Sequence, residues 1–386
     1  MSNNGHMIVI ADDITGAAEM AGIAFSRGQQ VSLVCGDVIA TDRTTVIATD
    51  TRSMSEAEAA TETRRIISHF SLPLLISHSS FLIYKKTDSA LRGHVIAELT
   101  ALMQVTGYQR AVYLPANPSK GRIIRNGIYY INNVPIHETD FSFDPEFPAK
   151  TSVLKERFPD AERCGIVMPD AETTENIRRV VARYNDGKTL FAGAADLFAV
   201  LLESAVDHVD HGDGSPDQSH LATTDQENCP HDTLILCGST QSKPLDLGIP
   251  VAPMPRAVYD GSNDLGGWDT KAFDSVHSLI LTIPYTHRTG KEVAVHLRTV
   301  MAEMAKNLIA RHCPDQLIIE GGATAWATLQ ALGWTQFDVV SQIAPGVVQM
   351  SATIACHASM SKKHVMVTLK PGSYPWGNLF SFSGNK

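Results

Sequence analysis

Two adjacent carboxylates, Asp12 and Asp13, follow the short apolar run of residues 7–11 near the start of the chain. Such a run is typical of a strand in a sheet that is covered on both faces. The pattern of residues 17–25 predicts a helix after it. Open α/β sheets bind ligands at the carboxyl ends of their strands. Two carboxylates at this turn can therefore bind a hydroxyl group or a metal, or accept a proton. The alternative is that one of them only caps the following helix.

Three further predicted strands, residues 45–49, 81–84 and 111–114, also end in polar side chains. Carboxyl ends of parallel strands meet at one edge of a sheet, so these side chains would offer carboxylates, an ammonium group and guanidinium groups to one small polyhydroxylated anion. Taken singly, each residue could instead be a helix cap or a surface ion pair. The predicted site residues of these segments are Asp50, Arg52, Lys86, Asp88, Ser89, Arg92, Asn117 and Arg122.

The C-terminal half places glycine and other small residues at its predicted strand ends. Glycine permits a close approach of the backbone, and the amides at a helix N-terminus bind phosphate without a lysine. Each piece alone could mark an ordinary turn. A hydroxyl-binding and carboxylate-binding half beside a phosphate-binding half is what phosphoryl transfer requires. The residues expected to bind the nucleotide are Ser239, Gly321, Gly322, Thr324, Pro345, Gly346 and Gly372.

The elements that must position these residues alternate between strand and helix patterns. This alternation predicts an α/β fold with two α/β domains, largely parallel sheets and an active site in the cleft between them. We expect an N-terminal domain that binds hydroxyl and carboxylate groups at residues 1–205, a linker at 206–232 and a C-terminal phosphate-binding domain at 233–386. The histidines and aspartates of the linker lack a regular spacing, which favours a solvated segment over a metal site.

Composition narrows the possible functions. The 386 residues carry a net charge of -9 without a basic run, so no nucleic acid partner is expected. No apolar stretch approaches the roughly 20 residues that span a bilayer, so we expect no membrane association. The six cysteines are scattered, which indicates reduced thiols and a cytoplasmic protein. The chain lacks a GxGxxG turn, and Ala182 stands where a P-loop at residues 182–189 would need glycine.

The N-terminal motifs resemble those of the four-carbon acid sugar kinases, which include D-threonate, D-erythronate and 3-oxo-tetronate kinases. The ADDxTGA, TDTR, K-x-DSxLRG and P-x-x-P-x-x-GR elements of that family correspond to residues 11–17, 49–52, 86–93 and 115–122. Looser GG-x-T, APGV and KPGS pieces extend the similarity along nearly the whole chain. The chain departs from the family pattern after Ser239 and within residues 370–377.

The resemblance implies transfer of phosphate from ATP, with Mg²⁺, to the terminal hydroxyl group of a four-carbon sugar acid. It also implies that the N-terminal domain binds the acid sugar and the C-terminal domain binds the nucleotide. We expect Arg92 and Arg52 to hold the substrate carboxylate and Asp12, Asp13 and Asp88 to bind its hydroxyl groups. Asp13 or Asp12 would orient or deprotonate the attacking hydroxyl, and Lys86 would neutralise the migrating phosphoryl group. A sugar-acid sensor and a dehydrogenase are the alternatives, and a homodimer is the default oligomeric state.

Overall fold

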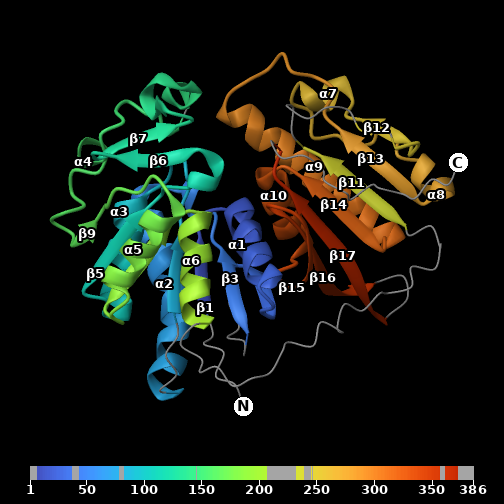
Figure 1. Ribbon diagram of the computed structural model, residues 1–386. Coiled ribbons are helices and arrows are strands. Elements are labelled where there is room, and N and C mark those ends of the chain that lie inside the picture. Colours follow the sequence, from blue (N-terminus) through green and yellow to red (C-terminus); the bar gives the residue numbers. More distant parts are fainter. Residues whose placement is uncertain are drawn as a thin grey trace, which may run out of the picture.

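The computed structural model describes residues 7–36, 43–77, 82–144, 146–206, 232–238, 245, 247–356 and 361–372. These residues form one sheet of 14 strands and a separate sheet of three short strands. Figure 1 shows the large sheet running through both halves of the molecule, with helix α1 between the two sets of strands.

Seven strands of the N-terminal half run parallel to one another, as the alternating pattern predicts. In sheet order they are β2 (Val31–Cys35), β3 (Thr44–Ala48), β1 (Met7–Ala11), β4 (Leu82–Lys86), β10 (Thr189–Gly193), β5 (Arg110–Leu114) and β9 (Ile166–Val167). The helices of this half are α1 (Ile14–Ser26), α2 (Glu56–Ser77), α3 (Val95–Thr106), α4 (Leu154–Arg157), α5 (Thr174–Tyr184) and α6 (Ala195–Val206).

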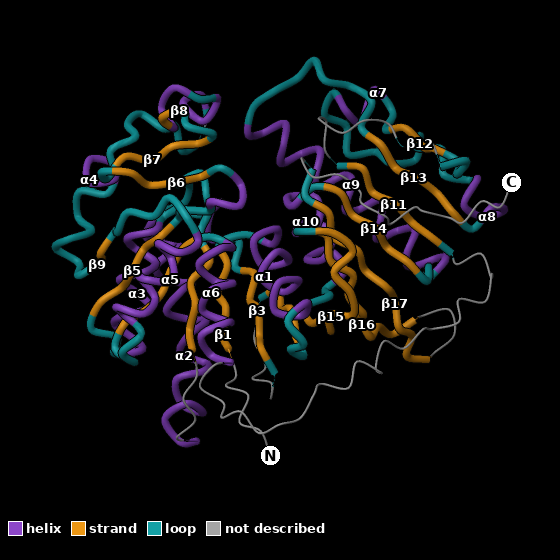
Figure 2. The backbone as a smooth tube through the Cα atoms, in the orientation of Figure 1, coloured by secondary structure: helices purple, strands orange, loops and turns teal. Residues whose placement is uncertain are grey.

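A small antiparallel sheet and four 3₁₀ turns complete the N-terminal half. The sheet stands apart from the large one (Figure 2) and consists of β6 (Arg122–Arg125), β7 (Ile128–Ile131) and β8 (Val134–Pro135). The turns are η1 (Thr51–Ser53), η2 (Pro118–Lys120), η3 (Ile136–Glu138) and η4 (Asp140–Phe143).

The C-terminal half contributes the other seven strands of the large sheet. Five are parallel, namely β12 (Val251–Pro253), β13 (Ser278–Thr282), β11 (Thr233–Cys237), β14 (Gln316–Glu320) and β17 (Ser361–Lys370). Two antiparallel strands follow β17 in the sheet, β16 (Val347–Cys356) and β15 (Gln336–Ala344). The helices are α7 (Arg256–Tyr259), α8 (Ala272–Val276), α9 (Lys291–His312) and α10 (Gly322–Leu332).

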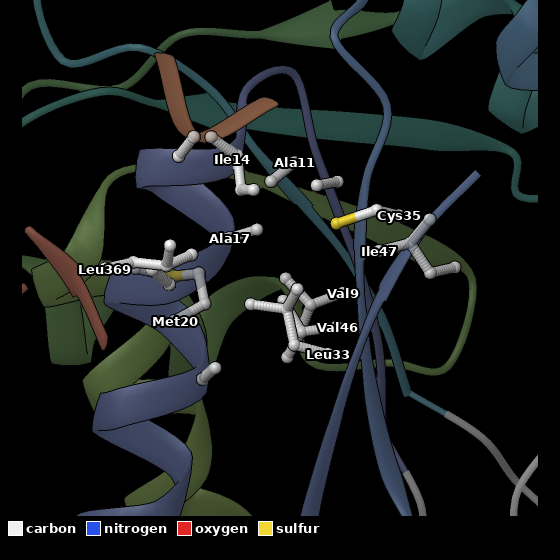
Figure 3. Close-up of a cluster of buried hydrophobic side chains, with 14 of the residues drawn as sticks. Val9, Ala11, Ile14, Ala17, Met20, Leu33, Cys35, Val46, Ile47 and Leu369 are labelled. Carbon is white, nitrogen blue, oxygen red and sulfur yellow. The ribbon is translucent and has the colours of Figure 1, made fainter. Parts of the chain in front are cut away.

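The two halves join because β15 pairs antiparallel with β2, in a register that sets Phe337 opposite Leu33. Helix α1 packs against strands from both sides of this junction. Figure 3 shows Leu369 of β17 beside α1, with Val9 and Leu33 on the other side of the helix. The predicted α/β class with largely parallel sheets is confirmed, and one continuous hydrophobic core links the halves.

Several local expectations differ from the structure in detail. Helix α1 begins at Ile14 instead of residue 17, because Asp13 is its N-cap and accepts a hydrogen bond from the Gly16 N–H. The strands β15 and β16 carry no strand prediction because they mix polar and apolar residues. The strands of the small sheet carry none because they are only 4, 4 and 2 residues long.

Two predictions from composition can be compared with the described residues. Among them, no helix combines the length and the apolar character that crossing a membrane requires. Cys35, Cys164, Cys237 and Cys313 are free thiols, as their scattered positions predict. The expected linker at 206–232 falls mostly on residues 207–231, which lie outside the described residues.

Candidate active site

A cavity of about 250 Å³ lies where the carboxyl ends of the N-terminal strands face helices α9 and α10. The N-terminal half contributes two predicted site residues that follow β3 and one that follows β1. The C-terminal half contributes the first turn of α10 and one arginine of α9. The lining residues are Asp13, Ile14, Thr15, Asp50, Arg52, Ser53, Glu146, Arg298, Gly322 and Ala323.

Arg52 is the centre of the polar network beside this cavity. Its Nε and Nη2 donate to the Asp12 carboxylate at 3.0 and 2.9 Å, and its Nη1 donates to Asp13 Oδ2 at 3.0 Å. Its Nη2 also lies 3.6 Å from Asp88 Oδ1. One guanidinium thus fixes three of the predicted carboxylates, because its planar set of donors can bind several acceptors at once.

Asp13 both caps helix α1 and lines the cavity, the two alternatives that the sequence left open. Its Oδ1 caps α1 by accepting from the Gly16 N–H at 2.8 Å, and its Oδ2 accepts from Thr15 Oγ1 and from Arg52. Burial acts to raise the pKa of Asp13, but the charges of Arg52 and Lys86 and these hydrogen bonds outweigh it, so the pKa is lowered. Asp13 is therefore an ionised carboxylate at the wall of the cavity.

Asp12 occupies a different environment from its neighbour. Its side chain is only 2% exposed, and it lies behind the cavity wall, where it receives the bidentate contact from Arg52. Burial raises the pKa of Asp12 more than the charge of Arg52 lowers it. The two adjacent aspartates thus differ in accessibility, since Asp13 lines the cavity and Asp12 does not.

Asp50 lies at the start of the 3₁₀ turn η1 and has a left-handed backbone with φ 53°. Its Oδ2 accepts a hydrogen bond from Ser53 Oγ at 2.6 Å. Burial raises the pKa of Asp50, while this hydrogen bond and the charge of Arg298 oppose the rise. The turn therefore presents Asp50, Arg52 and Ser53 together to the cavity.

The DSxLRG segment forms a second cluster that is joined to the first through Arg52. Arg92 makes a bidentate contact with Asp88, with Nε to Oδ2 at 2.9 Å and Nη2 to Oδ1 at 3.0 Å. Although burial acts to raise it, the charges of Arg52 and Arg92 hold the pKa of Asp88 well below its usual range. The guanidinium groups of Arg92 and Arg122 both lie over the ring of Phe141.

Ser89 and Asn117 take structural contacts close to this second cluster. Ser89 Oγ accepts from Arg122 Nη1, and the Ser89 carbonyl accepts from Tyr129. The Asn117 side chain is buried and accepts from the Asp196 N–H in the first turn of α6 at 3.1 Å. Asn117 therefore holds a helix in place and does not line the cavity described above.

Lys86 is buried on the inner side of Asp13. Its Nζ donates to the Thr87 carbonyl at 3.0 Å and lies 3.6 Å from Glu19 Oε2. Glu19 in turn accepts from Lys120. Lys86 contributes positive charge near Asp13, but its side chain is not among those that line the cavity.

Helix α10 brings the C-terminal glycines to the site. Its N-cap Gly321 has φ 96°, a conformation that favours glycine. A Cβ on Gly322 would lie 2.6 Å from Thr15 Cγ2, so only glycine lets α10 approach α1 this closely. The side chain of Thr324 is buried, and a Cβ on Gly238 would overlap it. Of the predicted residues in this helix, Gly322 lines the cavity and Thr324 packs behind it.

The other residues expected to bind the nucleotide lie apart from this cavity. Pro345 and Gly346, between β15 and β16, line a second cavity of about 210 Å³ together with Glu19 and Lys120. The Gly372 carbonyl lies 3.4 Å from Lys370 Nζ, which donates to Glu320 at the end of β14. Ser239 lies outside the described residues.

Four residues of the site are not among those predicted from the sequence, namely Arg298, Glu146, Thr15 and Phe141. Thr15 lies within the ADDxTGA element, so that motif could have indicated it. Arg298 belongs to the amphipathic segment of α9 and Glu146 to a loop, and neither has a local pattern that distinguishes it from an ordinary surface residue. In the part of the chain that the structure describes, no group of three or more His, Cys, Asp or Glu side chains is placed to hold a metal ion.

Two family models match this chain. A sugar-binding N-terminal domain matches residues 7–163, and a nucleotide-binding C-terminal domain matches residues 279–374. The first contains the Arg52 network, and the second contains the whole of α9 and α10. The cavity therefore lies between residues of the two matched domains.

Curated relatives support the same assignment, and solved structures share the fold. The chain is 33% identical to D-threonate kinase of Salmonella typhimurium over 39% of its length, and the aligned part spans only 35% of that kinase. It is 26% identical to 3-oxo-tetronate kinase of Brucella melitensis over 88% of both chains. The structure of a Haemophilus influenzae protein, 18% identical, shares the fold with a TM-score of 0.65 and covers 95% of this chain and 97% of that protein. The structure of a Salmonella typhimurium protein, also 18% identical, has a TM-score of 0.69 and covers 97% of both chains. The chain belongs to the four-carbon acid sugar kinase family, which pairs a sugar-binding N-terminal domain with a nucleotide-binding C-terminal domain.

Proposed function

We propose that this protein is an ATP-dependent kinase that phosphorylates the terminal hydroxyl group of a four-carbon sugar acid, such as D-threonate, D-erythronate or 3-oxo-tetronate. The observation that carries the proposal is the cavity in which Asp13 and Arg52 face Gly322 of α10. A carboxylate that can accept a proton and a helix N-terminus that favours phosphate are thus held beside one space. The names of the curated relatives support this reaction.

Asp13 is the residue that we expect to accept the proton from the attacking hydroxyl group. In the proposed step, the hydroxyl oxygen forms a bond to the γ-phosphorus of ATP, and the bond from that phosphorus to the β,γ-bridging oxygen breaks. ADP leaves with the electron pair, and the hydroxyl proton passes to Asp13. A carboxylate with a lowered pKa is a weak base, so we expect Asp13 first to orient the hydroxyl and then to accept its proton as the new P–O bond forms.

The sugar acid would extend from Asp13 toward the second cluster. Arg92 is the better candidate for its carboxylate, because its side chain is 32% exposed while that of Arg52 is 17% exposed and bound to three aspartates. Arg52 then fixes the carboxylates that bind the hydroxyl groups of the substrate. Arg122, which stacks on the same Phe141 ring as Arg92, adds a second cation at this end.

ATP would lie over the first turn of α10, where Gly322 and Ala323 face the cavity. Mg²⁺ prefers phosphate and water oxygens to a cage made by the protein, so the described residues suit an ion that arrives with ATP. Bound in this way, Mg²⁺ would neutralise charge on the phosphates.

A substrate panel tests the proposed function. The full-length protein is mixed with ATP and Mg²⁺ and with D-threonate, D-erythronate or 3-oxo-tetronate, and ADP is measured against a reaction without a sugar acid. We expect ADP to form with at least one of the three and a phosphorylated acid to appear in equal amount. Binding of an acid without ADP would support a sensor instead, and a change in NAD absorbance would support a dehydrogenase.

A further inference from the structure

Arg298 is a cavity-lining cation of the C-terminal half that no sequence motif marks. It lies in the third turn of α9, between the buried residues Leu297 and Val300. Because these neighbours anchor the helix in the core, the position of the Arg298 backbone is fixed. Its half-buried side chain lines the cavity that also contains Asp13 and Arg52.

The positive charge of Arg298 is not neutralised by the acids that surround it. Among the described residues it forms no ion pair, whereas Arg52 and Arg92 are both bound to aspartates. Glu146, an acid of the same cavity, pairs with Lys291 at 2.8 Å. Asp50 is close enough for the charge of Arg298 to lower its pKa, but its carboxylate accepts from Ser53.

The surroundings of Arg298 favour phosphate over a carboxylate as its ligand. Gly322 and Ala323 of α10 line the same cavity, and the N-terminus of a helix attracts anions through its free amides and its dipole. Asp13, at the first turn of α1, forms another part of the wall. A phosphoryl group between the α10 terminus and Asp13 would therefore lie beside the guanidinium of Arg298.

We propose that Arg298 binds the γ-phosphoryl group of ATP and stabilises its charge while it is transferred to the hydroxyl group held by Asp13. This inference rests on the proposed function and adds a catalytic residue to it. The guanidinium gains and loses no proton in the step, and the bonds formed and broken are those given above. Arg298 is better placed for this purpose than Lys86, which points to Glu19 and does not line the cavity.

The test compares Arg298→Met and Arg298→Lys with the wild-type protein. Lys306→Met is the matched control, because it removes one positive charge from an exposed position on the same helix. We expect Arg298→Met to lower kcat by about 10²–10³-fold, as for the loss of one donor to a developing charge. The KM for the sugar acid should stay within about threefold, since Arg298 would contact the phosphoryl group of the nucleotide and not the acid. Arg298→Lys should recover part of the loss, and Lys306→Met should match wild type.

Nucleotide binding gives a second readout that needs no sugar acid. Calorimetry with Mg²⁺ should show that Arg298→Met weakens binding of the non-hydrolysable analogue AMP-PNP by about tenfold or more, because a charge-assisted contact is lost. Binding of ADP, which lacks the γ-phosphate, should be unchanged. If no sugar acid were phosphorylated but this selectivity held, the proposed substrate would be wrong and the assignment of Arg298 would stand. The assignment of Arg298 would be wrong if Arg298→Met changed the binding of AMP-PNP and of ADP equally, or if it raised the KM for the acid at unchanged kcat.

Discussion

Asp12 and Asp13 show how two neighbouring residues of one type acquire different properties. The Asp12 carboxylate is buried and bound in a bidentate manner by Arg52, whereas the Asp13 side chain is 21% exposed and lines the cavity. Burial raises the pKa of Asp12, and the surrounding charges and hydrogen bonds lower that of Asp13. A group that must accept a proton from a ligand needs to be both ionised and accessible, so Asp13 is the candidate base.

Asp13→Asn should lower kcat by about 10²–10⁴-fold, the range in which general base catalysis contributes. The pH profile gives a further check. Because the pKa of Asp13 is lowered, the carboxylate stays ionised as pH falls until the pH is below the usual aspartate value of about 3.9. We therefore expect kcat to show no acid limb between about pH 5 and 8 from this residue. A variant within about tenfold of wild type would exclude the role of Asp13 as base.

At the scale of single elements, the 3₁₀ turn η1 depends on a buried polar network below the cavity. Thr51 Oγ1 and Lys85 Nζ both donate to Glu98 Oε1 at 2.6 Å, and Thr49 Oγ1 lies 2.9 Å from Thr51 Oγ1. The side chains of Lys85 and Glu98 are 0% and 1% exposed. Thr51 is the residue between Asp50 and Arg52, so this network fixes the turn that presents both of them.

Thr51→Val should lower the free energy of unfolding by about 1.5–3 kcal/mol, since a buried hydrogen bond to a charged acceptor is lost. Glu98→Gln should lower the free energy of unfolding further, by about 3–5 kcal/mol, because it leaves the buried Lys85 without its counter-ion. Urea unfolding of both variants measures these losses, and the KM of Thr51→Val for the sugar acid should rise.

Thr61→Val is the matched control for these variants, because the Thr61 hydroxyl is exposed and bonds only the Ala57 carbonyl of its own helix. It should change the free energy of unfolding by no more than about 0.5 kcal/mol. If Thr51→Val behaved in the same way, the network would not support the turn.

At the scale of the whole molecule, the two halves share a sheet and a core. The β2–β15 pairing sets Phe337 opposite Leu33, and Asp338 also binds Arg43 at 2.9 Å. Helix α1 starts at the turn that carries Asp12 and Asp13 and packs along this junction (Figure 3). The cavity walls are therefore attached to one continuous structure, which limits how far they can separate.

Phe337→Ala should destabilise both halves together, because the ring is fully buried at the junction. We expect the free energy of unfolding to fall by about 3–5 kcal/mol. The four tryptophans all follow residue 232, so their fluorescence reports on the C-terminal half, while far-UV circular dichroism reports on the whole chain. The two signals should share one midpoint in the variant as in the wild type.

Val340→Ala is the control for this prediction, because Val340 lies on the same strand and is exposed. Its effect should stay within about 0.5 kcal/mol. Separate midpoints for fluorescence and circular dichroism would show that the halves unfold independently.

The amino-acid sequence alone determined the strand–helix alternation and most of the N-terminal site. Residues 7–11 are buried as strand β1, and Asp13, Asp50 and Arg52 line the cavity. Such features follow from patterns of a few residues, since a strand and the turn after it are specified by neighbours in the chain. The sequence left open whether Asp13 caps α1 or faces a ligand, and in the structure it caps the helix and lines the cavity.

Only the tertiary structure decided which predicted residues meet. It bound Arg52 to Asp12, Asp13 and Asp88, turned Asn117 toward α6, and separated Pro345 from Gly322. It also brought Arg298 to Asp13 from the other half of the chain. The physical reason is that these contacts depend on the order of strands in the sheet and on the β2–β15 junction, and pairing between distant segments leaves no local pattern in the sequence.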